Sequence, residues 1–278
     1  MFAKKDDDIL KIDVDAVLKS RVPDYYRFIP KGLVRWLERT ICQDGLNGLL
    51  ERNRGKRGAA FCHAVLKDLD VTYDVSGEGF LPKNKRVIIV SNHPLGALDG
   101  IAMIDWVAKV YGKNVKFVVN DLLMNVKPLR DVFLPVNKHG RQKKEDSSAI
   151  DDYMAGDDPI IIFPAGLVSR KQPGGIEDLR WQKMFINKAV EYKRDIIPVF
   201  FDAKNSSFFY NFAKMRTLAG LKFNIEMIYL PREIFRSQGS KFHIRVGAPL
   251  SYTIFKGGSK ALEEARRVKH IVYNLKKS

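Results

Sequence analysis

Short apolar runs rich in β-branched residues recur along the chain from residue 71 onward. Each run has the length of one strand, and turn residues or helix-like segments separate one run from the next. Runs such as RVIIV and PIIIF are apolar at nearly every position, which is typical of strands buried on both faces. The pattern predicts strands at 71–75, 86–90, 115–119, 131–136, 159–163, 195–201, 223–230 and 241–246.

Helix-like segments lie between several of these strands. We expect helices at 99–111, 146–155, 178–193 and 207–219, and a basic closing helix at 259–276. Strands that alternate with helices indicate βαβ units and a buried, mostly parallel sheet. The last two strands are joined by a shorter non-helical link, so we expect them to form an antiparallel edge. The predicted fold is α/β, with a mostly parallel central sheet flanked by helices and an N-terminal helical appendage.

The N-terminal part of the chain has a different pattern. Within 24–41 (DYYRFIPKGLVRWLERTI), aromatic and aliphatic residues stand among arginines and lysines, and after Pro30 the apolar positions recur at helical spacing. A second helix is expected at about 57–69. These helices could pack on the main domain, lie on a membrane surface, or do both with different edges. We therefore divide the chain into this helical segment, 1–70, and an α/β domain, 71–278.

Charge narrows the choice of partners, because 48 Lys and Arg outnumber 32 Asp and Glu and give a formal net charge of +16. Such an excess favours nucleic acid, an anionic bilayer surface or an acidic carrier protein. Cys42 and Cys62 are too few for a disulfide framework and lack metal-ligand spacing, which indicates a reducing compartment. The N-terminus has no apolar signal-peptide core, and no apolar window is long enough to span a bilayer. Any membrane contact is therefore expected to be peripheral.

A candidate catalytic base follows the strand predicted at 86–90. The sequence VIIVSNHPLGALDG places His93 just beyond that strand and Asp99 near the start of the next helix. In an open α/β sheet, ligands bind outside the carboxyl ends of the strands. Asp99 could accept the Nδ1–H of His93 and leave Nε2 available as a base, or it could only complement the helix dipole. The geometry expected from sequence leaves both readings open.

A second motif, IIIFPAGLVSRK, follows the strand predicted at 159–163. If the two strands are neighbours, a histidine, an acid and a basic cluster converge on one crevice. The pair of motifs N-H-P…D and F-P-x-G-x-x-S-R, followed by I-P-V at 197–199, resembles the glycerolipid acyltransferase superfamily. That superfamily includes the 1-acylglycerol-3-phosphate acyltransferases. The resemblance covers residues 85–201 in order and spacing, and the rest of the chain more loosely.

The resemblance implies a bacterial acyltransferase of lipid biosynthesis that uses no metal and no resident cofactor. His93 would be the general base that deprotonates an acceptor hydroxyl, and Asp99 would orient it. The hydroxyl would attack the thioester of acyl-ACP or acyl-CoA, where the carrier is acyl carrier protein or coenzyme A. A positioned imidazole contributes roughly 10²–10⁴-fold to such a step. The motif residues that support the pair are Asn92, Gly96, Pro164 and Gly166.

The sequence departs from the common family pattern in ways that bear on the acceptor. Five residues separate His93 from Asp99 where four are usual. Gly96 is expected to accommodate the additional residue by adopting a backbone conformation that residues with a side chain rarely adopt. Ala165 and Val168 stand where the family commonly has a glutamate and an arginine associated with gripping glycerol phosphate. These replacements weaken the case for a lysophosphatidate acceptor.

The form F-P-A-G-x-x-S-R resembles the hemolysin-like subgroup, which includes O-acyltransferases that act on the lyso-forms of ornithine and glycine lipids. These acceptors end in a carboxylate, which Arg170 or Lys171 could bind as an ion pair. Ser169 and Arg141 complete the predicted acceptor-binding residues, with Arg141 in the basic stretch 139–145. Alternatively, these cations lie in a solvated surface loop and bind no acceptor.

The resulting prediction is a peripheral enzyme on the cytoplasmic side of the inner membrane that acylates a lyso-amino-acid lipid. Its partners would be the acyl carrier protein or coenzyme A thioester, the lysolipid and the anionic membrane surface. Lysophosphatidate is the alternative acceptor. The alternative of another class is a non-catalytic basic protein that binds nucleic acid or membrane, although no nucleic-acid module is recognisable. The aromatic segment 206–221 is expected to pack in the core, border an acyl-chain groove or touch lipid.

Overall fold

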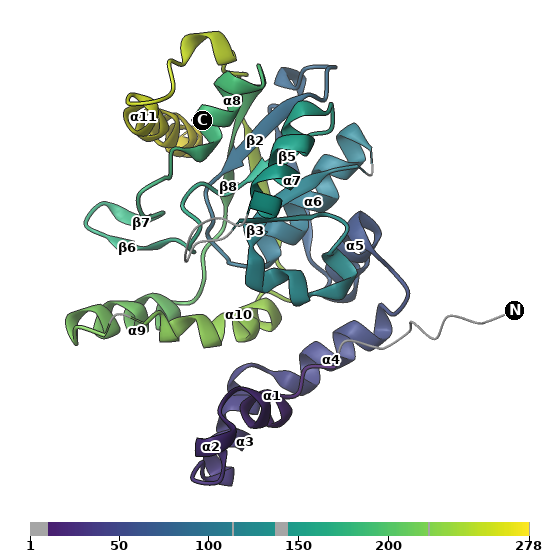
Figure 1. Cartoon of the computed structure of the whole chain (residues 1–278), viewed down its shortest axis with the longest axis vertical. Helices are drawn as coiled ribbons and strands as arrows, with labels where there is room; N and C mark the ends of the chain where they lie inside the picture. The colour runs from purple at the N-terminus through teal and green to yellow at the C-terminus, as the bar shows by residue number, and fades with distance from the viewer. Residues whose placement is uncertain (1–10, 113, 137–143, 222, 278) are drawn as a thin grey trace, which may run out of the picture.

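A seven-stranded sheet lies between two layers of helices in the computed structural model, which describes residues 11–112, 114–136, 144–221 and 223–277 (Figure 1). The strand order is β1-β9-β8-β2-β5-β3-β4. The strands of this sheet are β1 (Thr72–Ser76), β2 (Val87–Ser91), β3 (Lys116–Asn120), β4 (Phe133–Val136), β5 (Ile160–Ile162), β8 (Asp195–Asp202) and β9 (Lys241–Val246). A separate antiparallel hairpin consists of β6 (Arg170–Gln172) and β7 (Gly175–Glu177).

The five strands from β8 to β4 run parallel to one another, whereas β9 is antiparallel to β8 and pairs in parallel with β1. The predicted α/β class with a mostly parallel sheet is therefore confirmed. The parallel strands need crossover connections, and helices supply them on both faces. The crossover helices between parallel strands are α6 (Leu98–Tyr111), α7 (Lys144–Ala155) and α8 (Met184–Glu191). Of the other helices of the α/β body, α5 (Gly58–Asp68) precedes β1, α9 (Ser207–Leu218) and α10 (Leu230–Arg236) lie between β8 and β9, and α11 (Ala261–Asn274) follows β9.

The strand predicted at 223–230 is wrong, because the chain there forms a 3₁₀ turn, Ile225–Tyr229, that runs into α10. Pro231 lies in the first turn of α10, where the missing N–H costs nothing, whereas a strand ladder would need it. Glu226 is fully buried within this turn, which a strand reading of the apolar residues did not anticipate. The antiparallel pairing that was expected here is made instead by β9 with β8.

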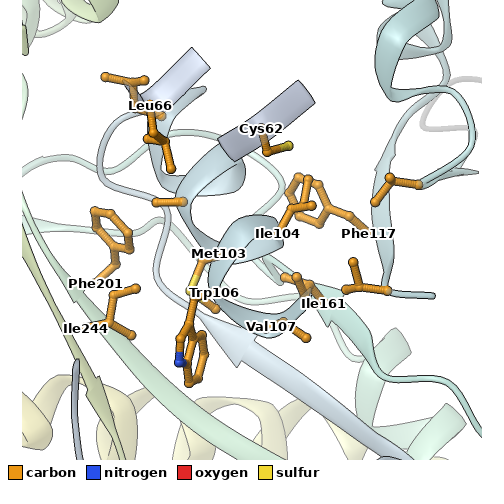
Figure 2. Close-up of a cluster of buried hydrophobic side chains, with 14 of the residues drawn as sticks. Cys62, Leu66, Met103, Ile104, Trp106, Val107, Phe117, Ile161, Phe201 and Ile244 are labelled. Carbon is orange, nitrogen blue, oxygen red and sulfur yellow. The ribbon is translucent and has the colours of Figure 1, made fainter. Parts of the chain in front are cut away.

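The central strand β2 is buried on both faces of the sheet, which explains why its sequence is a continuous apolar run. Val87 and Ile89 belong to a cluster on the α5/α6 face of the sheet, while Ile88 and Val90 belong to a cluster on the α7, α8 and α11 face. Figure 2 shows part of the first cluster, where side chains from α5 and α6 meet those of four strands. Each fully buried aliphatic side chain contributes about 1.5–3 kcal/mol relative to an exposed one. The strand that carries the candidate base is thus held from both faces.

The N-terminal helices divide between the main body and an extension. Cys62 and Leu66 of α5 lie in the core of Figure 2, so α5 packs as part of the α/β layers. The earlier helices extend along the lower end of the molecule in Figure 1. They touch α10 where a Cβ on Gly45 would approach the Phe235 ring to 2.8 Å. These helices are α1 (Val14–Arg21), α2 (Pro23–Tyr26), α3 (Lys31–Thr40) and α4 (Gln43–Arg52). Within the described ranges, every helix is too short or too polar to cross a bilayer.

Candidate active site

The two sequence motifs meet because their strands are neighbours. β2 pairs in parallel with β5, so the residues that follow each strand emerge at the same edge of the sheet. The ring of His93, after β2, lies 4.4 Å from the ring of Phe163, after β5. The backbone N–H of Ser169 donates to the carbonyl oxygen of His93 at 2.8 Å. The convergence expected from the motifs is therefore present.

His93 and Asp99 form a direct pair in which His93 Nδ1 lies 2.8 Å from Asp99 Oδ2. Asp99 is fully buried, whereas the His93 side chain keeps 16% of its surface exposed. A carboxylate only accepts hydrogen bonds, so this contact assigns the proton to Nδ1. No described residue hydrogen-bonds to Nε2, which leaves its lone pair available to a ligand. This arrangement suits a general base oriented by an acid.

Asp99 also complements the start of α6, so the two readings of its sequence position hold together. Its Oδ2 accepts the backbone N–H of Leu95 at 2.8 Å, and its Oδ1 accepts that of Gly100 at 2.9 Å. Burial by itself would raise the pKa of Asp99. The charge and hydrogen bond of His93, with the two backbone donors, outweigh burial and hold the pKa below its ordinary value. Asp99 is therefore ionised beside the imidazole.

Gly96 absorbs the additional residue of the first motif, as predicted, with a φ of +89°. A Cβ at this position would lie 2.7 Å from Cγ2 of Val168 and 2.8 Å from Cδ1 of Leu230. Val168 is fully buried against this turn. Gly96, which accommodates the longer His–Asp spacing, therefore packs directly against Val168, the residue that replaces the family's arginine. The side chain at position 168 faces the turn and not a ligand.

Arg170 lies in a different setting from the open cation that the sequence suggested. Its side chain is 9% exposed, and Nη2 donates to Glu226 Oε1 at 2.8 Å. Arg216 binds the same carboxylate, with Nε 2.7 Å from Oε2. Burial lowers the pKa of Arg170, partly offset by the charge of Glu226. The guanidinium therefore holds the loop after β5 to the turn before α10, with Nη1 donating to Val168 O and Nη2 to Glu226.

The structure describes two of the other three predicted acceptor residues, and they lie in different settings. Lys171 is exposed on β6, because alternate strand residues point to opposite sides. Ser169 is buried, and its hydroxyl donates to Asp178 Oδ1 at 2.6 Å. Arg141 lies outside the described residues.

Asp178 is a buried residue of the site that the sequence did not reveal. Its Oδ1 accepts the backbone N–H of His93 at 3.1 Å as well as the Ser169 hydroxyl, and its Oδ2 accepts the indole N–H of Trp181 at 2.9 Å. Its own N–H donates to the hydroxyl of Tyr273 at 2.6 Å. Burial raises the pKa of Asp178 in spite of these donors. Asp178 thereby ties the turn that carries His93 to α11. In sequence, Asp178 is one of three charged residues in IEDLRW and belongs to no recognised motif.

The residues that support the motifs fix the ends of the strands. The side-chain amide of Asn92 accepts from Phe201 N at 2.7 Å and donates to Phe201 O at 3.0 Å, which joins the end of β2 to β8. Pro164 O accepts from Gln182 N at 2.9 Å, and Gly166 has a φ of +60°. A second residue that the sequence did not reveal, Asn205, donates from Nδ2 to Pro94 O at 3.1 Å. The backbone around His93 is thus bound from both neighbouring strands.

Comparison with known proteins assigns the chain to a family. A family described as Acyltransferase matches residues 16–278. The chain belongs to the acyltransferase family. The resemblance of its motifs to the glycerolipid acyltransferase superfamily is confirmed, and this acyltransferase is an enzyme and not a non-catalytic binding protein.

Two relatives of this acyltransferase match over nearly the whole chain. The lyso-glycine lipid O-acyltransferase of Bacteroides thetaiotaomicron is 41% identical over 270 residues, which cover 97% of this chain and 99% of that protein. The lyso-glycine lipid O-acyltransferase of Phocaeicola vulgatus is 39% identical over 270 residues, 97% of each chain. A crystal structure of the 1-acyl-sn-glycerophosphate acyltransferase PlsC from Thermotoga maritima aligns with a TM-score of 0.46 and 17% identity, over 95% of this chain and 98% of that one.

Proposed function

We propose that this acyltransferase moves a fatty acyl group from a thioester to the hydroxyl of a lyso-glycine lipid. The observation that carries the proposal is the likeness, at 41% and 39% identity over 97% of the chain, to two relatives named for that acceptor. The His93–Asp99 pair supplies the base that such a reaction requires.

The reaction follows from the protonation states of the pair. Asp99 holds the Nδ1–H of His93, so Nε2 takes the proton of the acceptor hydroxyl as its oxygen attacks the thioester carbonyl. The tetrahedral intermediate collapses with cleavage of the carbon–sulfur bond. The imidazolium returns its proton to the departing thiolate, which leaves as the free thiol. The products are an ester of the lysolipid and the unloaded carrier, and the buried carboxylate of Asp99 stabilises the imidazolium between the two transfers.

Lys171 is the residue we assign to the head group of the acceptor. A glycine lipid carries one carboxylate, and an exposed ammonium beside the site can pair with it. Arg170, the other cation in this motif, is already bound to Glu226. The absence of a long basic side chain at Val168, which is buried against Gly96, also fits an acceptor without a phosphate.

The donor is acyl carrier protein or coenzyme A, and no further cofactor is required for thioester chemistry. The formal charge of +16 supports association with an acidic carrier and with an anionic bilayer. We place the enzyme on the cytoplasmic side of the inner membrane as a peripheral protein, because both the lysolipid and the carrier can be reached there.

The direct test offers purified enzyme an acyl thioester together with lyso-glycine lipid or lysophosphatidate. We expect diacylated product from lyso-glycine lipid, detected by mass spectrometry, and loss of that product by a factor of roughly 10²–10⁴ in His93→Ala. Product from lysophosphatidate alone would refute the acceptor, and an active His93→Ala would refute the base.

His63→Ala is a matched control for that variant. His63, on α5, also faces an aspartate, with Nδ1 3.2 Å from Oδ1 of Asp105 on α6, but its side chain is 61% exposed. We expect this variant to retain full activity. Loss of activity in both variants would indicate a general effect of removing histidine–aspartate pairs on folding.

A further inference from the structure

Helix α9 exposes a line of apolar side chains on its outward face. Phe208, Met215 and Leu218 are 47%, 67% and 77% exposed, and they recur at the spacing of one helix face. Phe208 stacks on Phe212 with ring centroids 5.9 Å apart, and both rings meet the edge of Tyr229. The outward side of α9 therefore carries large exposed apolar side chains near both ends of the helix, with the polar residues Ser207, Asn211 and Lys214 exposed beside them.

The chain that follows α9 continues this surface. Leu221, Phe223 and Ile225 are 50%, 81% and 40% exposed. We define the α9 surface as the six exposed apolar residues Phe208, Met215, Leu218, Leu221, Phe223 and Ile225. An exposed phenylalanine at 81% is costly in water, and contiguous apolar patches of this kind mark sites of interaction.

The inward face of α9 is apolar as well, so packing inside the protein does not explain the outer one. Phe209, Tyr210 and Ala213 are buried, and Phe209 packs with Val168 in a small core under the helix. Within the described residues, the large apolar side chains on the outward side of α9 stay exposed, which is typical of a contact surface.

The charges around the α9 surface select the partner. Between Asp202 and Glu226 the chain contains no acidic residue, and Lys204 and Lys214 in this stretch are both exposed. Glu226 itself is fully buried between Arg170 and Arg216. Apolar and aromatic side chains flanked by cations alone match the interface of an anionic bilayer, with its apolar interior and negative head groups.

Helix α9 also lies close to the turn that carries the candidate base. On its inner side, Phe209 packs under the guanidinium of Arg170 at 5.3 Å, and the Tyr210 hydroxyl accepts the backbone N–H of Asn205 at 3.0 Å. Asn205 in turn holds Pro94, the residue after His93. One helix thus separates the α9 surface from the turn that carries the candidate base.

We infer that the α9 surface inserts into the anionic bilayer that holds the acceptor, so that the lysolipid passes from the membrane to His93 beside α9. The inference deepens the proposed function and rests on it for the identity of the substrate. A second exposed group, Tyr25, Phe28 and Trp36, lies on α2 and α3 and their connection. An experiment on α9 must therefore report insertion of α9 itself, not attachment of the whole protein.

The test places an environment-sensitive NBD fluorophore on Met215→Cys in a Cys42→Ser background, since the remaining Cys62 is fully buried. With vesicles that contain phosphatidylglycerol we expect a blue shift and a rise in NBD emission, and quenching by doxyl lipids. Vesicles of phosphatidylcholine alone should give a smaller shift, and added salt should reverse part of the response. The matched control is Ile254→Cys, 52% exposed in the segment before α11 at the other end of the molecule in Figure 1, and it should give no shift.

Three results would overturn the inference. The first is sedimentation of the protein with anionic vesicles while the probe at position 215 stays in water, because another surface would then be the contact. The second is an equal shift at position 254. The third is a shift that grows with protein concentration without vesicles, which would make a second copy of the chain the cover.

Two further measurements separate this inference from the proposed function. Changing Met215, Leu218 and Phe223 together to serine should abolish insertion and lower acylation of vesicle-bound lyso-glycine lipid, while turnover of a detergent-dispersed acceptor persists. Insertion at position 215 without any acylation of lyso-glycine lipid would refute the acceptor and leave the membrane contact supported. Acylation with the probe still in water would refute only the membrane contact.

Discussion

Asp99 combines two roles that usually fall to different residues. One oxygen accepts from His93 and from the turn that leads to the helix, and the other accepts from the first turn of α6. The same carboxylate therefore orients the imidazole and closes the start of the helix. Removal of its charge should affect both chemistry and stability, and the two effects can be measured separately.

Asp99→Asn is expected to lower kcat by roughly 10²–10⁴-fold, because an amide cannot fix the Nδ1–H tautomer of His93 as a carboxylate does. The pKa of Asp99 in the folded protein lies below its ordinary value of 3.8. The unfolded chain therefore binds this proton more readily, and ionised Asp99 stabilises the fold above about pH 4. The stability advantage of the natural protein over the variant, from urea unfolding, should be full at pH 7 and shrink as the pH falls below about 4.

Asp178→Asn serves as a contrast for the pH series, because burial raises the pKa of Asp178 where that of Asp99 is lowered. A raised pKa means that the folded state binds the proton more readily, so ionisation of Asp178 lowers stability as the pH rises through that range. The two variants should therefore show opposite trends against pH. Parallel trends would contradict the assigned ionisation of Asp99.

Gly96→Ala tests the link between the longer spacing and Val168. The new methyl group would meet Val168 and Leu230 at less than 3 Å and would hold alanine at a positive φ. We expect the free energy of unfolding to fall by about 2–4 kcal/mol, the sum of backbone strain and overpacking. Denaturant unfolding measures the loss, and activity should fall with it because the turn carries His93.

Two comparisons isolate the contact from the strain. Gly55→Ala has a similar φ of +77° with nothing within 4 Å, so it should cost only the strain, about 1–2 kcal/mol. Val168→Ala in the Gly96→Ala background should recover part of the loss. Equal costs at positions 96 and 55 would show that the contact with Val168 has no energetic weight.

At the scale of elements, the strands that could be predicted are those whose apolar runs are buried on both faces. β2 and β8 match their sequence expectations closely, since every residue from Val87 to Ser91 is buried. The failure at 223–230 has the opposite cause. Its apolar residues serve a helical turn that is closed by the ion pair of Glu226 with Arg170, a partner 56 residues away. Local periodicity does not contain such a contact.

Besides apolar packing, the buried side chain of Arg194 joins α7 to the sheet, because its guanidinium donates to backbone carbonyls that include Met154, Tyr153 and Asp158. Burial lowers the pKa of Arg194 to about 10. Arg194→Lys cannot reproduce the planar fork and leaves buried carbonyls unpaired, so the free energy of unfolding should fall by about 2–4 kcal/mol.

Chemical denaturation of Arg194→Lys should be compared with Arg266→Lys, which makes the same exchange at an exposed position of α11. The control is expected to change stability by less than about 0.5 kcal/mol. If both variants unfold at the same denaturant concentration, the carbonyl contacts of Arg194 contribute nothing beyond those of a surface arginine.

The charge of the whole molecule sets how it meets its partners. A formal charge of +16 should draw the enzyme to an acidic carrier and to anionic lipid over the Debye length, about 10 Å at 0.1 M salt and about 3 Å at 1 M. We expect kcat/KM for an acyl carrier protein thioester to fall by roughly 10-fold or more between these salt concentrations. Steady-state kinetics across a salt series would measure the effect.

An uncharged short thioester, such as an acyl-N-acetylcysteamine, provides the reference in that series. Because it carries no charge, its kcat/KM should stay nearly constant with salt. A decline of equal size for both donors would place the salt effect on the enzyme or the acceptor and not on recognition of the carrier.

By itself, the sequence determined the fold class, the family, the candidate base and the positive-φ conformation of Gly96, because each depends on local periodicity or on a short ordered motif. Tertiary structure alone decided which strands are neighbours, and with that the meeting of His93 with the loop after β5. It also decided that Arg170 is bound to Glu226 and that Asp178 supports the backbone of His93. These contacts join residues 56 and 85 positions apart, and they depend on strand order and burial, which no local pattern encodes.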